Sequence, residues 1–284
     1  AKELFGLSLV MDLDTNQKHL IREFKMLIYK GFKKAIDLGI PTNFAAVLCD
    51  EEFGSEVLID AKHNGFVTIL TIEKSGEKEF KFQYEDFKSH IQNFKPEFTK
   101  VLIRYNPSDL PDLKIRLKMY LKILSDYSHK ENFKFLLELL VIPTKNQLTD
   151  VLQSREEYDR KIRPVLTVEV IKDLQNAGIE PDVWKLEGFD TEFEYSEIVK
   201  TIKSNGRENV GLVILGRGAN EEKVNEWLRV GSGIKGVMGF AVGRTVFWQA
   251  IEKFNKGEIG KAEVIDTVAQ NFFEFYGIFT ASTN

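Results

Sequence analysis

The sequence contains little of the chemistry that stabilises small secreted proteins or builds metal centres. Its 284 residues include a single cysteine, Cys49, which excludes an internal disulfide framework and makes a reducing cytoplasm the expected compartment. The few histidines lack the spacing of metal ligands, and none falls at the carboxyl end of an expected strand. These histidines are His19, His63, His90 and His129. We therefore expect no metal and no other cofactor.

Long apolar runs and a charge excess of one sign are also missing. No apolar run reaches the roughly 18 residues needed to span a bilayer, so we expect no membrane partner. The formal net charge is -4, and the lysines within residues 30–34 alternate with Phe and Ala at helical spacing. This pattern predicts a solvated helix face and no binding of nucleic acid. The segment Ala1–Leu4 carries an acid and does not resemble a signal peptide.

Alternation of two patterns is the main feature of the chain. Apolar runs rich in β-branched and aromatic residues predict eight strands, and most of them are followed by an amphipathic stretch that predicts a helix. The predicted strands are Phe5–Met11, Asn43–Cys49, Phe66–Ile72, Lys100–Tyr105, Phe133–Ile142, Asp182–Glu187, Val210–Leu215 and Gly236–Val242.

Two of the predicted helices have especially clear apolar stripes. The first follows a start signal at Ser108 and Asp109, and the second is closed by Gly178. The stripes consist of Leu113, Leu117, Tyr120, Leu121 and Leu124 in the first, and of Val165, Val168, Ile171 and Leu174 in the second.

Eight strand signals with intervening helices predict a single (β/α)₈ barrel, the TIM-barrel fold, that spans residues 1–284. The rival is a doubly wound open sheet, which usually needs fewer strands, and the first strand is not followed by its GxGxxG motif. No domain linker interrupts the alternation. Because barrel enzymes carry their chemistry at the carboxyl ends of the strands, polar residues there are the candidates for a site.

The sixth predicted strand, Asp182–Glu187, contains one lysine in an apolar context. Lys185 alternates with Trp184 and Leu186, whose size suits the side of a sheet that faces helices. Lys185 is therefore expected to point into the barrel, where an enclosed lysine indicates a function. The alternative is a lysine that extends from the strand end into solvent.

The fifth and fourth predicted strands add a carboxylate and two cations. Glu138 is a lone acid among apolar residues, and burial would raise its pKa toward the range that is useful for proton transfer. The alternative is a buried acid paired with a structural Arg or Lys. Lys100 and Arg104 lie four residues apart and thus on one strand face, where each fits an ion pair as well as a site.

Acidic residues follow the first two predicted strands. Asp12 ends the first strand, and Asp50, Glu51 and Glu52 follow the second. Each fits a helix cap or an ion pair as well as a substrate site. Asp12 together with Asp14, or the Asp50 segment, would also suit Mg²⁺, but acidic pairs are common in loops and this signal is weak.

The last two predicted strands run into glycine–arginine pairs. Gly216, Arg217 and Gly218 follow the seventh strand, and Gly243 and Arg244 follow the eighth. Glycines let backbone N–H groups approach an anion, and barrels often bind phosphate in these two loops. We therefore expect an anion site here, with ordinary turn glycines as the alternative.

Taken in order, these segments resemble the class I aldolases of the tagatose bisphosphate aldolase group over nearly the whole chain. The resemblance implies that Lys185 forms a Schiff base and that Glu138 is the acid/base residue. It also implies that Lys100 and Asp12 position and polarise substrate oxygens. The segments that carry it are Ser8–Asp12, Ala46–Gly54, Lys100–Ile103, Leu136–Glu138 and Val183–Glu187.

A second resemblance is to the aldolase-like domain fused behind the sugar kinase of bacterial inositol breakdown, 5-dehydro-2-deoxygluconokinase, and to its stand-alone relatives. It rests on Gly178–Gly188, Leu215–Ala219 and Gly239–Thr245. This resemblance implies a substrate similar to 2-deoxy-5-keto-gluconate 6-phosphate, which would be split to dihydroxyacetone phosphate and malonate semialdehyde.

Two departures separate the chain from the bisphosphate aldolases. Leu13 and Asp14 stand where those enzymes have Gln-Arg, and Gly216–Gly218 replaces their Ser-rich turn. The anion pockets therefore differ, which argues against tagatose or fructose bisphosphate as the substrate, and a tagatose or fructose bisphosphate aldolase is kept as an alternative.

The sequence thus predicts a metal-independent, Schiff-base aldolase whose partner is a small phosphorylated sugar or sugar acid. Burial and the neighbouring Lys100 are expected to lower the pKa of Lys185. Two other classes stay open: a sugar-phosphate isomerase or decarboxylase with no covalent step, and a non-catalytic sugar-phosphate sensor. The combination of Lys185, Glu138 and Lys100 argues against a sensor. The sequence leaves the oligomeric state open, including a homo-oligomer.

Overall fold

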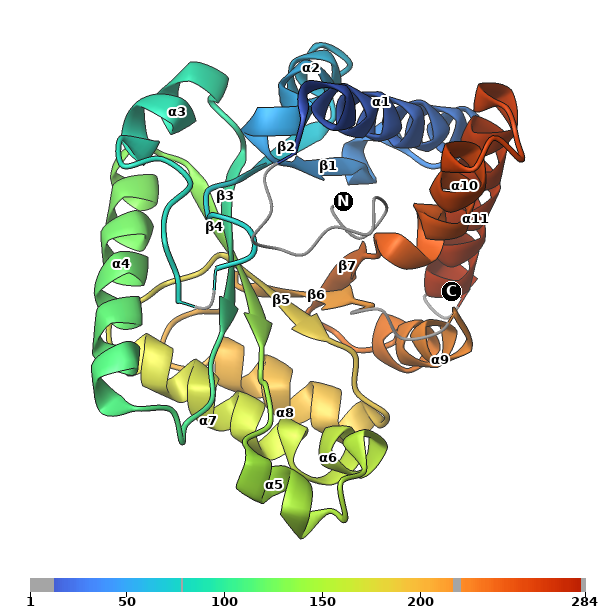
Figure 1. Ribbon diagram of the computed structural model, residues 1–284. Coiled ribbons are helices and arrows are strands. Elements are labelled where there is room, and N and C mark those ends of the chain that lie inside the picture. The colour runs from blue at the N-terminus through green and yellow to red at the C-terminus, as the bar shows by residue number, and fades with distance from the viewer. Residues whose placement is uncertain (1–12, 78, 217–220, 282–284) are drawn as a thin grey trace.

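The computed structural model describes residues 13–77, 79–216 and 221–281, and strands and helices alternate along them (Figure 1). The strands are β1 (Ala46–Cys49), β2 (Val67–Thr71), β3 (Phe98–Arg104), β4 (Lys134–Leu140), β5 (Val183–Glu187), β6 (Gly211–Leu215) and β7 (Val237–Ala241). The helices are α1 (Thr15–Asp37), the 3-10 helix η2 (Thr42–Phe44), α2 (Glu51–His63), α3 (Phe87–Phe94), α4 (Pro111–Lys130), α5 (Lys145–Asp150), α6 (Arg155–Lys161), α7 (Arg163–Asn176), α8 (Glu192–Ile202), α9 (Glu221–Ser232), α10 (Arg244–Asn255) and α11 (Lys261–Ala281).

The strands form one parallel sheet in the order β1-β2-β3-β4-β5-β6-β7. Seven of the eight predicted strands are thereby confirmed, and the predicted strand Phe5–Met11 lies outside the described residues. Within the described part of the chain, β1 and β7 are the edge strands. Closure into an eight-stranded barrel therefore stays a prediction.

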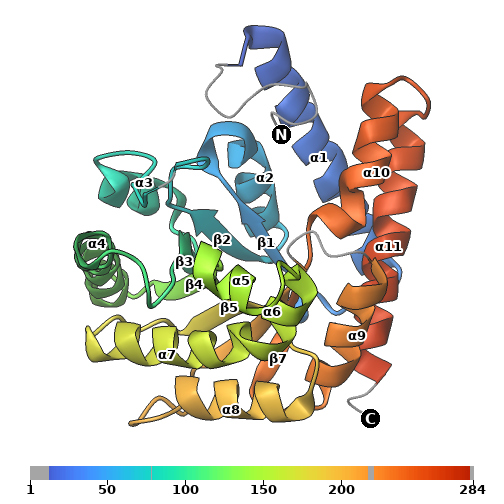
Figure 2. The same cartoon turned by 60° about the horizontal axis from the view of Figure 1, so that its bottom comes forward.

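The strand order follows the chain order without a reversal, and the sheet curls on itself with helices on its outside (Figures 1 and 2). A doubly wound sheet would instead reverse its order at a switch point. The described sheet therefore has the arrangement of a TIM-like barrel.

The two faces of the sheet carry different cores. Trp184 and Leu186 lie in the large buried cluster between the sheet and the helices, as their alternation with Lys185 predicted. The inner face carries a smaller apolar cluster centred on buried side chains of β2, β4 and β5, which are Ile69, Leu136 and Val183. Within each strand, alternate side chains thus face the helices or the interior of the curled sheet.

Both clearly patterned helices are confirmed. Leu121 and Leu124 of α4 and Leu174 of α7 are buried in the helix-facing core. The chain leaves α7 through Gly178, whose φ of 71° lies in the left-handed region that glycine adopts without strain. No helix in the described part of the chain combines the length and the apolarity needed to cross a bilayer.

Helices from opposite ends of the described chain pack together. α1 lies along α11 (Figure 2), and Lys34 of α1 forms an ion pair with Asp266 of α11. At the closest approach, a Cβ added to Gly31 would lie only 2.6 Å from the Cβ of Val268 and 3.0 Å from the carbonyl oxygen of Ile265. Glycine at position 31 is therefore required by the spacing between the two helices.

This spacing makes a prediction about two helical glycines. Gly31→Ala should lower the free energy of unfolding by about 1–3 kcal/mol, because the added methyl group overpacks the contact with Val268. Gly277→Ala is the matched control, because an added Cβ there meets nothing within 4 Å. The control should be more stable than wild type by roughly 0.5–1 kcal/mol, since alanine is the better helix former. Urea denaturation measures both, and a stabilised Gly31→Ala variant would contradict the packing argument.

Candidate active site

Three of the predicted catalytic residues lie on neighbouring strands of the sheet. Glu138 on β4 pairs directly with Lys185 on β5, and Leu102 on β3 pairs with Glu138. Lys100 lies two residues before Leu102 and so shares its face. Lys185 has the same parity as Val183 of the interior apolar layer, so these side chains belong to the inner face of the sheet.

The side chains meet in a compact group of charges. Glu138 Oε2 lies 2.9 Å from Lys100 Nζ and 3.0 Å from Lys185 Nζ, so one carboxylate oxygen bridges both lysines. Lys100 Nζ also donates a hydrogen bond of 2.5 Å to Oε1 of Glu73. The exposed fraction of the four side chains is 5% for Lys100, 9% for Glu138, 10% for Glu73 and 11% for Lys185. We call these four residues the charged cluster.

The pKa of Glu138 differs from the sequence-based expectation. Burial does raise it, but the attraction of Lys100 and Lys185 outweighs burial and lowers the pKa of Glu138 to about 2. The expected elevated pKa is therefore wrong, because the prediction counted burial and not the two cations. Glu138 is therefore an ionised carboxylate in the resting protein.

The two lysines have opposite shifts. Burial lowers the pKa of Lys185, and the attraction of Glu138 only partly offsets this while Lys100 lowers the pKa further. Burial also disfavours the charged form of Lys100, but Glu73 and Glu138 together raise its pKa above the ordinary value. Lys100 is thus the permanent cation of the charged cluster, and Lys185 is the lysine that gives up its proton more readily.

Glu73 is a member of this group that the sequence reasoning missed. It lies two residues beyond the end of β2 at Thr71, on the face that Ile69 shares, and period two carries that face past the strand end. A carboxylate on the inner face just after a strand was the signal that would have found it. Burial raises the pKa of Glu73, and Lys100 opposes this only in part.

Not every predicted residue is brought to the charged cluster. Asp12 lies outside the described residues, as do Arg217 and Gly218. Asp50 caps α2 by accepting a 2.9 Å hydrogen bond from the backbone N–H of Phe53, and it forms an ion pair with Lys25 of α1. Both carboxylate oxygens of Asp50 are therefore engaged in structural contacts.

The glycines predicted to bind an anion lie at adjacent strand ends. Leu215 at the end of β6 pairs with Ala241 at the end of β7, so Gly216 and Gly243 leave neighbouring strands. Gly243 is the N-cap of α10 and offers no side chain to cap the first turn, and Arg244 begins the helix in an exposed position. A helix N-terminus without a side-chain cap leaves backbone N–H groups for an anion.

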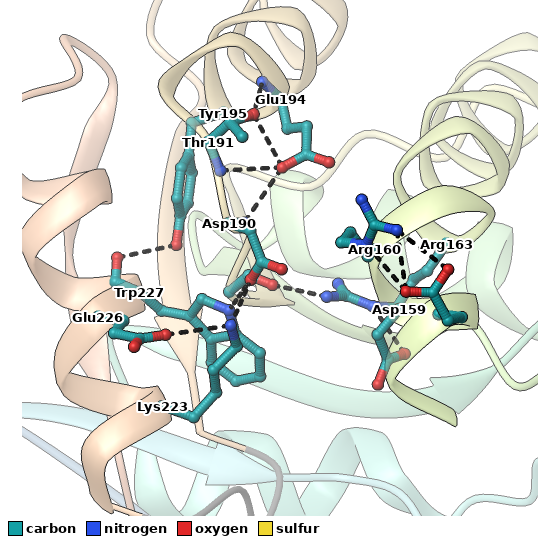
Figure 3. Close-up of polar contacts among 12 residues, drawn as sticks. Asp159, Arg160, Arg163, Asp190, Thr191, Glu194, Tyr195, Lys223, Glu226 and Trp227 are labelled. Atoms are coloured by element: carbon teal, nitrogen blue, oxygen red, sulfur yellow. Dashed lines mark hydrogen bonds and ion pairs between the residues drawn. The ribbon is translucent and has the colours of Figure 1, made fainter. Parts of the chain in front are cut away.

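A polar network fixes the segment that follows the end of β5 at Glu187, two residues after Lys185 (Figure 3). Arg163 Nη2 donates a 2.7 Å hydrogen bond to the carbonyl oxygen of Gly188, and Trp227 Nε1 donates one of 2.8 Å to Asp190. Lys223 forms an ion pair with the same carboxylate at 2.9 Å. A Cβ on Gly188 would lie 2.2 Å from Trp227, so only glycine allows this approach. The segment from Gly188 to Asp190 is thus held by α7 through Arg163 and by α9 through Trp227 and Lys223.

Metal ligands do not gather in the described part of the protein: no group of three or more His, Cys, Asp or Glu side chains there is arranged to hold an ion.

The fold is shared with solved structures, two of which are fructose-1,6-bisphosphate aldolases. A Corynebacterium glutamicum protein, Cgl0159, is 14% identical with a TM-score of 0.56, over 93% of this chain and 80% of its own. An archaeal fructose 1,6-bisphosphate aldolase is 13% identical with a TM-score of 0.51, over 86% of this chain and 99% of its own. A Schiff-base-forming fructose-1,6-bisphosphate aldolase is 15% identical with a TM-score of 0.50, over 83% and 99%. At these identities the likeness shows a common fold.

The described sheet and its helices thus define an α/β protein with a TIM-like barrel arrangement. By sequence, the chain belongs to the family described as "Uncharacterized protein conserved in bacteria (DUF2090)", which it matches over residues 7–282. None of the curated proteins matches it.

The contacts of the two lysines predict unequal effects of their removal on stability. Lys100→Met removes the cation that pairs with both Glu73 and Glu138, and it should lower the free energy of unfolding by about 3–5 kcal/mol. Lys185→Met leaves Glu138 paired with Lys100, so its stability should stay within about 1 kcal/mol of wild type. Chemical denaturation at neutral pH measures both. Equal losses in the two variants would contradict the unequal roles.

Proposed function

We propose that the protein is a class I aldolase that cleaves a phosphorylated keto sugar or sugar acid through a Schiff base on Lys185. The observation that carries the proposal is a buried lysine with a lowered pKa, held 3.0 Å from an ionised carboxylate on the inner face of the sheet. A desolvated lysine beside a second ammonium is the usual form of an amine nucleophile. The aldolase-type fold supports the same reading as an analogy.

Formation of the Schiff base follows from the contacts of Glu138. The free amine of Lys185 attacks the substrate ketone, a C–N bond forms, and the carbonyl oxygen becomes the hydroxyl group of a carbinolamine. Glu138 takes the surplus proton from the nitrogen and passes it to the oxygen, and a second proton, which the condensation consumes and Glu138 delivers, lets the hydroxyl leave as water. Its distance of 3.0 Å from Lys185 is within the reach of direct proton transfer.

Cleavage then uses the iminium ion as an electron sink. The bond between the α and β carbons breaks, its electron pair moves into the iminium system to form an enamine, and the β-hydroxyl group gives its proton to Glu138 and becomes an aldehyde, so that Glu138 holds the proton that the enamine carbon later takes. Protonation of the enamine carbon and hydrolysis release the second product and restore Lys185. Lys100, whose pKa is raised, stays cationic throughout and polarises a substrate oxygen. We assign Asp12 the same positioning role.

The phosphate is proposed to bind at the ends of β6 and β7. Gly216 and Gly243 bring backbone N–H groups to one edge of the sheet, and α10 adds its N-terminus. We assign Arg217, Gly218 and Arg244 to the same anion site. Because Asp50 is held by a cap and an ion pair, its proposed part in substrate binding is indirect, through the loop that it orders.

The preferred substrate is one similar to 2-deoxy-5-keto-gluconate 6-phosphate, with dihydroxyacetone phosphate and malonate semialdehyde as products. The support is the resemblance of Gly178–Gly188, Leu215–Ala219 and Gly239–Thr245 to the aldolase-like domain behind the inositol-pathway sugar kinase. The departures at Leu13, Asp14 and Gly216 argue against tagatose and fructose bisphosphates.

Borohydride reduction in the presence of substrate tests the covalent step. Wild type should yield a mass adduct on the peptide that contains Lys185, and Lys185→Met should yield none and lose all measurable turnover, because the nucleophile is gone. Lys134→Met is the matched control, since Lys134 is an exposed lysine at the start of β4, and it should retain both adduct and turnover. Peptide mass spectrometry locates the adduct.

Two outcomes would overturn the assignment: an adduct found only on Lys100, or full catalysis by Lys185→Met. Turnover without any adduct in wild type would favour an isomerase or decarboxylase with no covalent step. Binding of sugar phosphates without turnover would favour a sensor.

The anion site makes a separate prediction. Arg244→Ala should weaken binding of a phosphorylated substrate by roughly ten- to a hundredfold, because a charge-assisted hydrogen bond contributes about 1.5–3 kcal/mol. The fold should be unchanged, since Arg244 is exposed at the first position of α10. Arg229→Ala, on α9, is a control of the same charge. An unchanged KM in Arg244→Ala would argue against phosphate binding in these loops.

A further inference from the structure

The backbone holds Glu73 in a fixed place beyond the end of β2. The N–H of Ile72 donates to the carbonyl oxygen of Lys100 at 2.9 Å, and Gln83 donates back to Ile72 at 2.8 Å. An antiparallel bridge joins Glu73 itself to Phe82. The segment after β2 therefore folds back over the sheet edge and presents the Glu73 carboxyl group to Lys100.

The two oxygens of this carboxyl group differ. Oε1 accepts the hydrogen bond from Lys100, whereas Oε2 is buried without a hydrogen-bond partner among the described residues. An ionised carboxylate with a buried, unpaired oxygen carries a large desolvation cost, and a neutral carboxylic acid carries a much smaller one. The surroundings of Glu73 therefore favour its protonated form.

The order in which the four residues of the charged cluster contact one another also favours the protonated form of Glu73. The contacts run from Glu73 to Lys100, Glu138 and Lys185 over distances of 2.5, 2.9 and 3.0 Å. Among the described residues, the two inner members each touch two groups of opposite charge, while Glu73 and Lys185 at the ends each touch one. Charge is therefore best compensated on the inner pair, and the end members are best kept neutral. The pKa shifts agree, with Glu73 raised and Lys185 lowered.

We propose that Glu73 holds one proton in the resting site and supplies it, through Lys100 and Glu138, when the Schiff base forms on Lys185. The inference rests on the proposed aldolase function. Condensation of a neutral amine with a ketone to give an iminium ion and water consumes one proton. Glu73 gives a proton to Lys100 as Lys100 gives one to Glu138, and Glu138 passes one to the departing hydroxyl. At the end Glu73 is ionised and the iminium is cationic, so the cluster keeps its net charge.

Glu73 is in this role a positioning residue, because it acts through two others. The charged groups that face it are Lys100 on β3, Glu138 on β4 and, across these, Lys185 on β5. No exchange with bulk water is needed for the dehydration step, which suits a cluster whose side chains are at most 11% exposed. Schiff-base formation in wild type should therefore depend little on pH near neutrality.

Infrared spectroscopy of the protein alone tests where the proton lies. Wild type at neutral pH should show the C=O stretch of a protonated carboxyl group that shifts in D₂O. The band should vanish in Glu73→Gln and persist in Glu97→Gln, whose carboxylate accepts hydrogen bonds from Thr68 at the opposite end of the sheet. If wild type lacks the band, or if the band survives in Glu73→Gln, the proposal is overturned without any reference to activity. Should Glu73→Gln fail to fold, loss of the band in wild type on raising the pH decides the same point.

The rate of borohydride trapping tests the supply of the proton. In Glu73→Gln the amine of Lys185 is still free to attack, but dehydration must take its proton from water. Trapping should slow by about a hundredfold near neutral pH, and roughly between pH 6 and 8 its rate should fall about tenfold for each unit of rise. Wild type and Glu97→Gln should stay nearly flat over that range. Parallel pH profiles in all three proteins would refute the proton supply and leave the aldolase function intact. If wild type forms no adduct at all, the aldolase function fails, and the infrared band still decides whether Glu73 holds the proton.

Discussion

Mutual compensation among four buried ionisable groups is the constraint on which the rest of the site depends. An ammonium or carboxylate group taken out of water alone costs several kcal/mol, so each member of the charged cluster requires its neighbours. The alternation Glu73, Lys100, Glu138, Lys185 is produced by the register of β3, β4 and β5 together with the turn after β2. A slip of one residue in β5 would exchange Lys185 with Trp184 or Leu186, and would place an ammonium group in the helix-facing core. The strand register therefore determines which ionisable groups are neighbours, and through them the ionisation of the site.

The layering of the interior explains why these charges can work as a unit. Ile69, Leu136 and Val183 form an apolar layer on the same face of the sheet as the charged side chains, and each precedes the charged residue of its own strand or of the segment after it. This layer excludes water from one side of the cluster and strengthens every electrostatic interaction in it. At the other side, the segment after β5 is fixed by Arg163 and Asp190. Reactive side chains carried on strands and backed by packed layers are held more precisely than side chains on loops.

Local patterns in the sequence predicted most of the fold and the direction of the side chains, but not the energetics of the site. Period two was sufficient to turn Lys185 inward, because alternation within one strand needs no knowledge of its neighbours. The ionisation of Glu138 depends on two lysines from other strands, and no local pattern contains them. Glu73 lies past the end of its strand and is buried only because the chain returns through Phe82. By sequence Asp50 suits a helix cap and a substrate site equally well, and the ion pair with Lys25 of the preceding helix α1 shows that it has structural contacts.

The contact between α1 and α11 can form only late in the synthesis of the chain, because the two helices lie far apart in the sequence. Residues 34 and 266, which form an ion pair, are separated by 232 positions, so the groove on α1 at Gly31 stays uncovered during most of synthesis. At a translation rate of about 5–20 residues per second, the wait lasts roughly ten to fifty seconds. During that time the apolar side of α1, including Phe32 and Ala35, has no α11 to cover it. Until α11 has left the ribosome, the nascent chain therefore exposes this side of α1 to misassociation.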